Sequence, residues 1–252
     1  MRIEARNLDK HFRSVHAVKD LSFTVEPGRV TGFLGPNGSG KSTTMRLMLG
    51  LDSGGGETLY DGKKLSSHYP VTRTIGAHLD AKFFHPKRTA YAHLRMLGAE
   101  AGISKARVHE VLKLVGLESV AKKRPGGFSL GMGQRLGLAG AILADPQVLM
   151  LDEPANGLDP QSIQWLRDFL KYYASTGKSV LVSSHLLSEM ELLADDVVVI
   201  ARGNLIAAES MPAFLSRATG SAVVVRSPQS EKLAELLNAQ GIASTTDGAR
   251  TI

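Results

Sequence analysis

Short apolar runs separated by helical patterns dominate the chain. Val148–Leu151 and residues 197–200 are apolar at every position, which is expected of strands covered by helices on both faces. Val30–Leu34 and residues 179–182 are similar runs, and the first is followed by a helical pattern over residues 42–49. Strands that alternate with helices predict an α/β core built on a largely parallel sheet.

Residues 89–144 differ from this core because they carry helical patterns and almost no strand pattern. Residues 106–115, for example, place apolar side chains at helical spacing. Residues 123–127, with Pro125, Gly126 and Gly127, interrupt the helical pattern. We therefore predict a helical subdomain, at about residues 85–144, inserted into the α/β core.

The first sixty residues suggest a second, smaller sheet. Residues 2–6, 21–25 and 58–60 alternate between apolar and polar positions more than the core runs do. Such alternation is typical of antiparallel strands with one covered face, so a small antiparallel β-subdomain is expected beside the core. Residues 53–56, Ser-Gly-Gly-Gly, are interpreted as a flexible turn.

The C-terminal part of the chain carries no motif of the kinds described below. We therefore divide the chain into a domain at residues 1–210 and a tail at residues 211–252. Within the tail, residues 222–226 are interpreted as a strand and residues 229–239 as an amphipathic helix. Residues from 242 onward begin a further strand with nothing after it to pair, so we expect an incomplete regulatory or dimerising module.

Composition narrows the class of protein. The 252 residues are 43% hydrophobic, but the longest strongly apolar uncharged stretch, residues 136–144, is shorter than the roughly 18 to 20 residues that span a bilayer. Without cysteine or an apolar leader, a cytoplasmic location is expected. The net charge of +6 is spread along the chain, so no nucleic-acid partner is expected.

A phosphate-binding loop is the strongest single motif. Its residues match the pattern G-x-x-x-x-G-K-[ST], lie between an apolar run and a helical pattern, and are Gly35, Pro36, Asn37, Gly38, Ser39, Gly40, Lys41, Ser42 and Thr43. Backbone N–H groups and the helix N-terminus would surround phosphate oxygens. Lys41 would neutralise the β and γ oxygens and the Ser42 hydroxyl would ligate Mg²⁺. The alternative is a glycine-rich turn that only caps a helix.

Two adjacent acids follow the apolar run Val148–Leu151. Ligands of open α/β sheets bind at the carboxyl ends of the strands, so Asp152 and Glu153 would face the same crevice as the phosphate-binding loop. Asp152 would hold Mg²⁺, and Glu153 would be the general base for an attacking water. The alternative is a pair of solvated acids at the end of a strand.

In this order the motifs resemble those of ABC (ATP-binding cassette) ATPases, and the resemblance covers residues 1–208. Ahead of the Asp152 strand, the segment Phe-Ser-Leu-Gly-Met at residues 128–132 resembles the family signature L-S-G-G-Q, with Ser129 and Gly131 matching and the other three positions differing. The resemblance implies a P-loop NTPase (RecA-like) core. Ser129 is also placed to cap the helix that follows it, and in the family this serine contacts the γ-phosphate across a dimer interface.

The resemblance implies roles for four further residues. Asp159 falls in a segment like the family's D-loop and also has the sequence of a helix N-cap followed by proline. His185 matches the switch histidine that senses the γ-phosphate, although a lone histidine is more often structural. Phe12 lies where the family stacks an aromatic ring on adenine, with a buried core phenylalanine as the alternative. Asp80 replaces the usual Q-loop glutamine, so we assign it to coupling and leave metal ligation open.

Within the family, several segments look similar to single-cassette subunits of bacterial drug, antibiotic or lantibiotic exporters. These include the altered signature, residues 155–160, and Phe83, Phe84, His85 and Pro86 with Arg88 and Thr89. The resemblance implies ATP and Mg²⁺ as cofactors, a homodimer that sandwiches two ATP molecules, and a separate transmembrane permease. It also implies a peripheral position on the inner face of the cell membrane. The alternative function is a soluble ABC-family ATPase that acts on ribosomes or nucleic acid.

Overall fold

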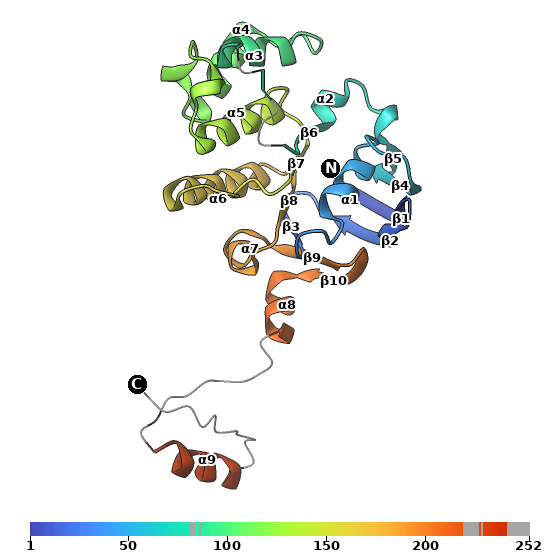
Figure 1. Cartoon of the computed structure of the whole chain (residues 1–252), viewed down its shortest axis with the longest axis vertical. Helices are drawn as coiled ribbons and strands as arrows, with labels where there is room; N and C mark the ends of the chain where they lie inside the picture. Colours follow the sequence, from blue (N-terminus) through green and yellow to red (C-terminus); the bar gives the residue numbers. More distant parts are fainter. Residues whose placement is uncertain (81–83, 86, 219–226, 228, 241–252) are drawn as a thin grey trace. The chain divides into compact units, whose positions relative to one another are not determined.

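In the computed structural model, which describes residues 1–80, 84–85, 87–218, 227 and 229–240, a six-stranded sheet forms the predicted α/β core (Figure 1). The strand order is β10-β9-β3-β8-β7-β6, and all neighbours are parallel except β9 and β10. The strands are β3 (Val30–Leu34), β6 (Ile75–His78), β7 (Val148–Leu151), β8 (Ser179–Ser184), β9 (Asp196–Ala201) and β10 (Asn204–Ser210). The largely parallel sheet is therefore confirmed.

Two strands of this sheet were not predicted. β6 contains Gly76 and His78, which weaken its apolar pattern. β10 is an edge strand whose Leu205 and Ile206 are exposed, so its pattern does not match that of a covered strand. Both segments adopt the strand conformation because they pair with β7 and β9, respectively, and not because of their local composition.

Helices cover both faces of the sheet. α6 (Pro160–Ser175) and α7 (Leu187–Leu193) lie on one side, and α1 (Lys41–Met48) lies with the smaller sheet on the other (Figure 1). α6 buries Leu166, Phe169 and Leu170 at helical spacing. α7 approaches β3 so closely that a side chain at Gly32 would lie 2.8 Å from the Met190 sulfur. α8 (Met211–Ala218) follows β10.

The predicted antiparallel subdomain is a four-stranded sheet in the order β2-β1-β4-β5. Its strands are β1 (Ile3–Phe12), β2 (Val15–Val25), β4 (Gly55–Tyr60) and β5 (Lys63–Lys64). Apolar side chains of this sheet, α1 and the large sheet form one core, which includes Ile3, Leu21, Phe33 and Met45. The Tyr60 hydroxyl donates to the Met48 carbonyl inside this core, and burial raises the pKa of Tyr60.

The flexible turn predicted at residues 53–56 is wrong for its last two residues, which belong to β4. A Cβ atom at Gly56 would lie 2.2 Å from the Asn7 carbonyl oxygen, and one at Gly54 would lie 2.4 Å from that of Asp9. Gly56 also has a φ of +76°. These glycines therefore allow β4 to approach β1 and are not a sign of flexibility.

Three α-helices and two short 3-10 helices lie between β6 and β7, and the structure has no strand there within residues 87–144. The α-helices are α3 (Ala90–Leu97), α4 (Lys105–Leu114) and α5 (Leu130–Ile142), whereas the short helix α2 (Val71–Thr74) comes before β6. Thr89, Ser104 and Ser129 each cap a helix by accepting a hydrogen bond from the N–H three residues on. These helices are therefore inserted between two strands of the large sheet, β6 and β7.

Helix α5 packs against β6 through glycines on both elements. A Cβ atom at Gly76 would lie 1.9 Å from the Ala141 carbonyl oxygen, and one at Gly137 would lie 2.1 Å from the His78 ring. Gly137→Ala is expected to lower the free energy of unfolding by about 1–3 kcal/mol, the usual effect of overpacking. Urea denaturation measures this difference.

Gly127→Ala is the matched control for that substitution, because a Cβ atom at Gly127 would meet no atom within 4 Å. Since alanine is also a better helix former than glycine by about 1 kcal/mol, Gly127→Ala should not lower the free energy of unfolding. If Gly137→Ala proved as stable as the unsubstituted protein, the His78 ring would have to be free to move away from α5.

The chain divides into two units, residues Met1–Phe214 and Leu215–Ile252. In the second, α9 (Ser230–Ala239) coincides with the predicted amphipathic helix. The strands predicted at residues 222–226 and from residue 242 onward lie outside the described residues. Across the described part of both units, no helix combines the length and apolar character needed to cross a bilayer.

Candidate functional site

The phosphate-binding loop joins β3 to α1. Gly38 and Gly40 have φ values of +77° and +108°, a backbone conformation that favours glycine. A Cβ atom at Gly40 would lie 2.5 Å from the Ala17 carbonyl oxygen of β2, and one at Gly35 would lie 2.4 Å from that of Ile200. The loop is therefore pressed against both sheets and ends at a helix N-terminus, where backbone N–H groups favour anions.

Lys41 occupies the centre of this loop. Its side chain is almost completely buried, and Nζ donates hydrogen bonds to the carbonyl oxygens of Gly35, at 2.6 Å, and Pro36, at 3.3 Å. Nζ also lies 3.1 Å from Oε1 of Glu153, but this contact lacks hydrogen-bond geometry, since the buried Oε1 has no hydrogen-bond partner. The ion pair joins the phosphate-binding loop to the acidic pair that follows β7.

The two acids are held by the end of the neighbouring strand, β8. The Ser183 hydroxyl accepts a hydrogen bond from the Glu153 N–H at 2.8 Å and donates one to Oδ1 of Asp152. Glu153 has a φ of +47°, a left-handed conformation that costs about 1–3 kcal/mol for a residue other than glycine and is common at functional sites. Since their backbone and side chains are fixed in this way, Asp152 and Glu153 are not freely solvated acids.

His185 completes the set from the carboxyl end of β8. Its Nδ1 lies 2.9 Å from Oε2 of Glu153. Oε1 of the same carboxylate faces the Lys41 ammonium, so Glu153 lies between a cation and an imidazole. The structure thus brings together side chains that follow β3, β7 and β8, as the sequence predicts. An ionised carboxylate in this position can accept a proton from a water molecule.

The loop and the acids fit a phosphate group and Mg²⁺. The Ser39 hydroxyl is buried without a hydrogen-bond partner, so it can bind a phosphate oxygen. The Ser42 hydroxyl is exposed at the start of α1, and Asp152 adds a carboxylate from the end of β7. Oxygen donors of these kinds are those that Mg²⁺ prefers.

The signature segment forms the start of α5. Ser129 is exposed, and its hydroxyl accepts a hydrogen bond from the Met132 N–H at 3.3 Å, which confirms the predicted cap. A Cβ atom at Gly131 would lie 3.5 Å from the Ser162 hydroxyl. Leu130 lies against Gly157, where a Cβ atom would be 2.5 Å from its side chain. Within the chain, the signature therefore packs against the D-loop segment.

Asp159 caps α6, as predicted. Its Oδ1 accepts a hydrogen bond from the Ser162 N–H at 2.8 Å, and its Oδ2 accepts one from the Ser162 hydroxyl at 3.0 Å. These bonds lower the pKa of Asp159 because they stabilise the ionised carboxylate. Pro160 takes the first helical position, so the helix begins where the local sequence places it.

Phe12 is not a core phenylalanine, so that alternative is wrong. It pairs with Val15 beside the turn of the β1–β2 hairpin and is 46% exposed. Val15 is 61% exposed as well, and the Lys10 ammonium lies 4.8 Å from the ring centroid of Phe12. An exposed ring is available to stack on a base.

Asp80 lies two residues beyond β6 and is exposed. β6 and β7 are parallel neighbours, so Asp80 and Asp152 follow adjacent strands of the sheet. The Asp152 N–H donates to the His78 carbonyl oxygen at 2.9 Å. Phe83 and Pro86, which form part of the exporter-like segment, lie outside the described residues.

A buried polar pair next to Asp152 is a feature that the sequence did not predict. Nε2 of His78, in β6, lies 2.7 Å from Oε1 of Gln134, in α5, and both side chains are buried. The pair joins the strand that precedes Asp80 to the helix that begins at the signature. Because the two residues are far apart in the sequence, no local pattern could have indicated it.

Burial lowers the pKa of His78, although the Gln134 hydrogen bond and nearby carboxylates act in the opposite direction. The unfolded chain therefore binds a proton before the folded one does, near the ordinary histidine pKa of about 6.5. We expect the free energy of unfolding to fall as the pH drops from 7 to 5. Urea denaturation across this pH range measures the effect.

His78→Gln should reduce this pH dependence, whereas His109→Gln, at an exposed histidine, should not. Part of the dependence should remain, because burial also lowers the pKa of His93. Equal slopes for His78→Gln and the unsubstituted protein would contradict the assignment.

The chain is similar to known proteins over the residues that form this site. Residues 18–156 match the ABC transporter family. YhcH of Bacillus subtilis, an ABC transporter ATP-binding protein, is 43% identical over 208 residues, which cover 81% of this chain and 68% of that protein. The bacitracin transport ATP-binding protein BcrA of Bacillus licheniformis is 40% identical over 213 residues, with coverage of 81% and 68%.

Two further similarities extend the comparison. The lantibiotic transport ATP-binding protein SrtF of Streptococcus pyogenes is 35% identical over 205 residues, which cover 81% of this chain and 89% of that protein. A solved structure of the ATP-binding subunit of an ABC transporter superposes with a TM-score of 0.77 and 25% identity, and the match covers 94% of this chain and all of that one.

Proposed function

Because the chain belongs to the ABC transporter family and is an ATPase of that family, we propose that it powers a separate membrane permease that exports a drug, an antibiotic or another amphipathic compound. The observation that carries the catalytic part is Glu153, which is held between Lys41 and His185. Export is supported by the similarity to transport proteins for bacitracin and lantibiotics.

In this proposal ATP binding rearranges the partners of Lys41. Its ammonium exchanges the Gly35 and Pro36 carbonyl oxygens and the Glu153 carboxylate for the β and γ phosphate oxygens. Glu153 is then free to accept a proton from the attacking water, which His185 orients. Mg²⁺, held by Ser42 and Asp152, would neutralise charge on the phosphates. Asp80 would belong to the coupling segment.

We assign the adenine to the exposed ring of Phe12 and the second half of each ATP site to a partner copy of the chain. Ser129 supports this homodimer, because its exposed hydroxyl lies at the N-terminus of α5 while the neighbouring Leu130 and Gly131 pack on the D-loop segment. Such a terminus can bind the γ-phosphate of ATP held by the partner. Asp159, at the same surface, would help to organise the dimer.

The permease would place this chain on the inner face of the membrane.

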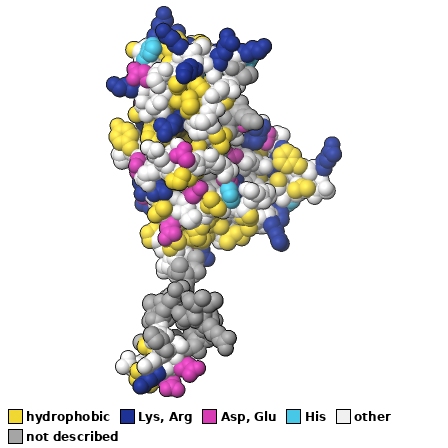
Figure 2. All heavy atoms as spheres, turned by 60° about the vertical axis from the view of Figure 1, so that its left-hand side comes forward, with side chains coloured by type: hydrophobic (Ala, Val, Ile, Leu, Met, Phe, Trp, Pro, Cys, Tyr) yellow, Lys and Arg dark blue, Asp and Glu magenta, His cyan; other side chains and the backbone are white. Residues whose placement is uncertain are grey.

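On the face drawn in Figure 2, Lys and Arg side chains are spread over the surface with acidic side chains among them, and several lie on the helical subdomain. A basic stripe interleaved with aromatic rings is what a nucleic-acid surface requires. The distribution supports a protein partner over a nucleic acid.

Purification of the chain from membranes of its own cell tests the proposal. We expect a polytopic membrane protein to co-purify and to change the rate of ATP hydrolysis when both are reconstituted in vesicles. The catalytically impaired Glu153→Gln variant serves as the background for ATP hydrolysis by contaminating proteins. Stimulation of hydrolysis by ribosomes, with no co-purifying membrane protein, would instead support the alternative function.

A further inference from the structure

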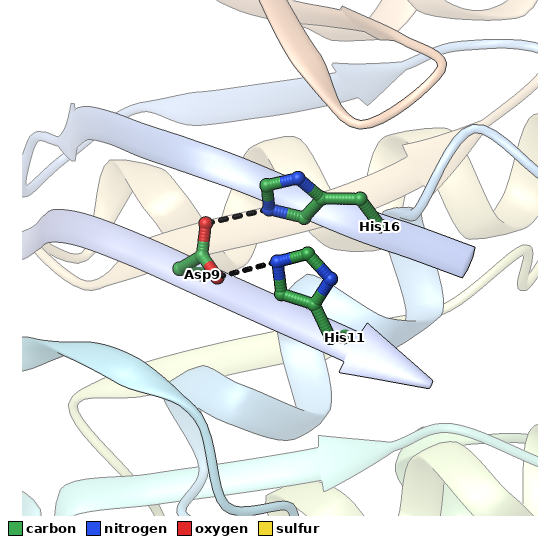
Figure 3. Close-up of side chains that lie close together, drawn as sticks. All are labelled: Asp9, His11 and His16. Carbon is green, nitrogen blue, oxygen red and sulfur yellow. Dashed lines mark hydrogen bonds and ion pairs between the residues drawn. The ribbon is translucent and has the colours of Figure 1, made fainter. Parts of the chain in front are cut away.

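Three side chains with metal-binding atoms meet on the β1–β2 hairpin, outside the proposed ATP-hydrolysing site (Figure 3). Nε2 of His16 lies 2.7 Å from Oδ2 of Asp9, and Nε2 of His11 lies 3.7 Å from Oδ1 of the same carboxylate. Ligand atoms of all three residues lie within 4.8 Å of one another. The two imidazole rings are stacked, with centroids 3.7 Å apart and planes inclined by 21°.

The backbone explains why the three residues converge. His11 in β1 is directly opposite His16 in β2, and the register of the two strands shifts on either side of Lys10. Residues directly opposite each other have Cβ atoms only about 4.5–5.5 Å apart. Asp9 and His11, two positions apart in one strand, extend from the same face of the hairpin. The Lys10 ammonium lies instead over the ring of Phe12.

The cluster has the charge that a cation requires. The hydrogen bond from His16 lowers the pKa of Asp9, and His11 acts in the same direction, so the carboxylate is ionised near neutral pH. The side chains of Asp9 and His16 are each 35% exposed and that of His11 is 58% exposed. An ion can therefore reach the cluster from solvent without opening the fold.

We propose that Asp9, His11 and His16 bind one divalent transition-metal ion of the Zn²⁺ class. Two imidazoles and one carboxylate form a ligand set that suits Zn²⁺, with water in the fourth position. Mg²⁺ and Ca²⁺ prefer oxygen ligands throughout. Bond lengths of about 2.0–2.2 Å require the two rings to rotate out of their stack, so that both Nε2 atoms point at one ion.

An ion bound by these three residues would also affect ATP binding. This part of the inference rests on the role in adenine binding proposed above for Phe12. Phe12 follows His11 directly, and the next residue after His16 is Ala17, whose carbonyl lies against the phosphate-binding loop at Gly40. Bound metal would join β1 to β2 just before the exposed ring. It would reduce the conformational freedom that ATP binding must remove, so ATP should bind more tightly.

Isothermal titration calorimetry of nucleotide-free protein with Zn²⁺ tests the site. The protein must carry no affinity tag, and the buffer no chelating component. We expect one Zn²⁺ per chain. His11→Ala, His16→Ala and Asp9→Asn should each weaken binding by at least about 10-fold, since even the loss of an outer-shell partner typically has this effect.

Two control variants locate the ion. His109→Ala removes an exposed histidine outside the cluster, and His185→Ala removes the imidazole that lies 2.9 Å from Glu153. Both should bind Zn²⁺ like the unsubstituted protein. Unchanged binding by His11→Ala and His16→Ala, or loss of binding in His185→Ala, would overturn the proposed site, whatever the outcome for ATP hydrolysis.

The effect on the nucleotide site is measured separately. With Mg²⁺ in excess, Zn²⁺ should raise the affinity for ATP of the unsubstituted protein and of His109→Ala by about 5-fold or more, at the lower end of typical couplings. The double variant His11→Ala/His16→Ala should show no such change. Chelation of Zn²⁺ by ATP itself is equal for all three proteins. An equal response in the double variant would overturn the coupling and leave the test of the site unaffected.

Discussion

Glu153→Gln is expected to lower kcat for ATP hydrolysis by about 10²- to 10⁴-fold, the range over which a general base contributes. The amide has nearly the volume of the carboxylate but cannot accept the proton of the attacking water. It also loses the ion pair with Lys41, whose Nζ lies 3.1 Å from Oε1. ATP should still bind, because the phosphate-binding loop is unchanged. Steady-state hydrolysis and equilibrium binding of ATP measure the two quantities.

The same variant tests the homodimer. If each ATP site is completed by Ser129 of a partner chain, slow hydrolysis should trap an ATP-bound dimer that elutes earlier than the monomer in size-exclusion chromatography. Glu191→Gln, at an exposed glutamate of α7, is the matched control and should hydrolyse ATP at the normal rate. A Glu153→Gln protein that binds ATP but stays monomeric would contradict the composite site.

Lys41→Met is expected to weaken ATP binding by on the order of 100-fold, because several charge-assisted hydrogen bonds to phosphate oxygens are lost together. Methionine keeps much of the volume of this almost completely buried side chain. The substitution also removes the ammonium that lies 3.1 Å from Oε1 of Glu153. Binding of a fluorescent ATP analogue, measured without hydrolysis, gives the affinity.

Two comparisons separate this effect from misfolding. Lys171→Met, at an exposed lysine of α6, should leave the affinity for ATP unchanged. Far-ultraviolet circular dichroism should show the same helix content for both variants, since Lys41 is only the first residue of α1. A folded Lys41→Met protein with unchanged affinity for ATP would show that this loop does not hold the phosphates.

Local features of this protein are determined by contiguous residues, and the sequence predicts them well. The phosphate-binding loop needs only the run Gly35 to Thr43 between a strand and a helix. The caps at Ser129 and Asp159 depend on atoms within three residues of each other. The apolar runs at Val30–Leu34 and Val148–Leu151 are strands at the predicted bounds. In each case short-range geometry decides the conformation.

Other features are decided by neighbours distant in sequence, which override the local pattern or leave it undecided. Gly55 and Gly56 look like a turn, yet the approach of β1 places them in a strand. For Phe12 the sequence left a core position open as an alternative, and only the tertiary structure, in which the ring is 46% exposed, decided against it. The edge strand β10 is paired by β9 although its apolar side chains are exposed.

The candidate site shows most clearly which features the sequence determines and which depend on the tertiary structure. The sequence by itself determined which residues are the candidates for the chemistry: Lys41, Asp152 and Glu153 through short motifs, and His185 through the resemblance to the family. Only the tertiary structure decided that one carboxylate of Glu153 meets both Lys41 and His185, that His78 meets Gln134, and that Asp9, His11 and His16 converge. These contacts depend on strand order, register and a local register shift, which are set by packing between segments far apart in the chain.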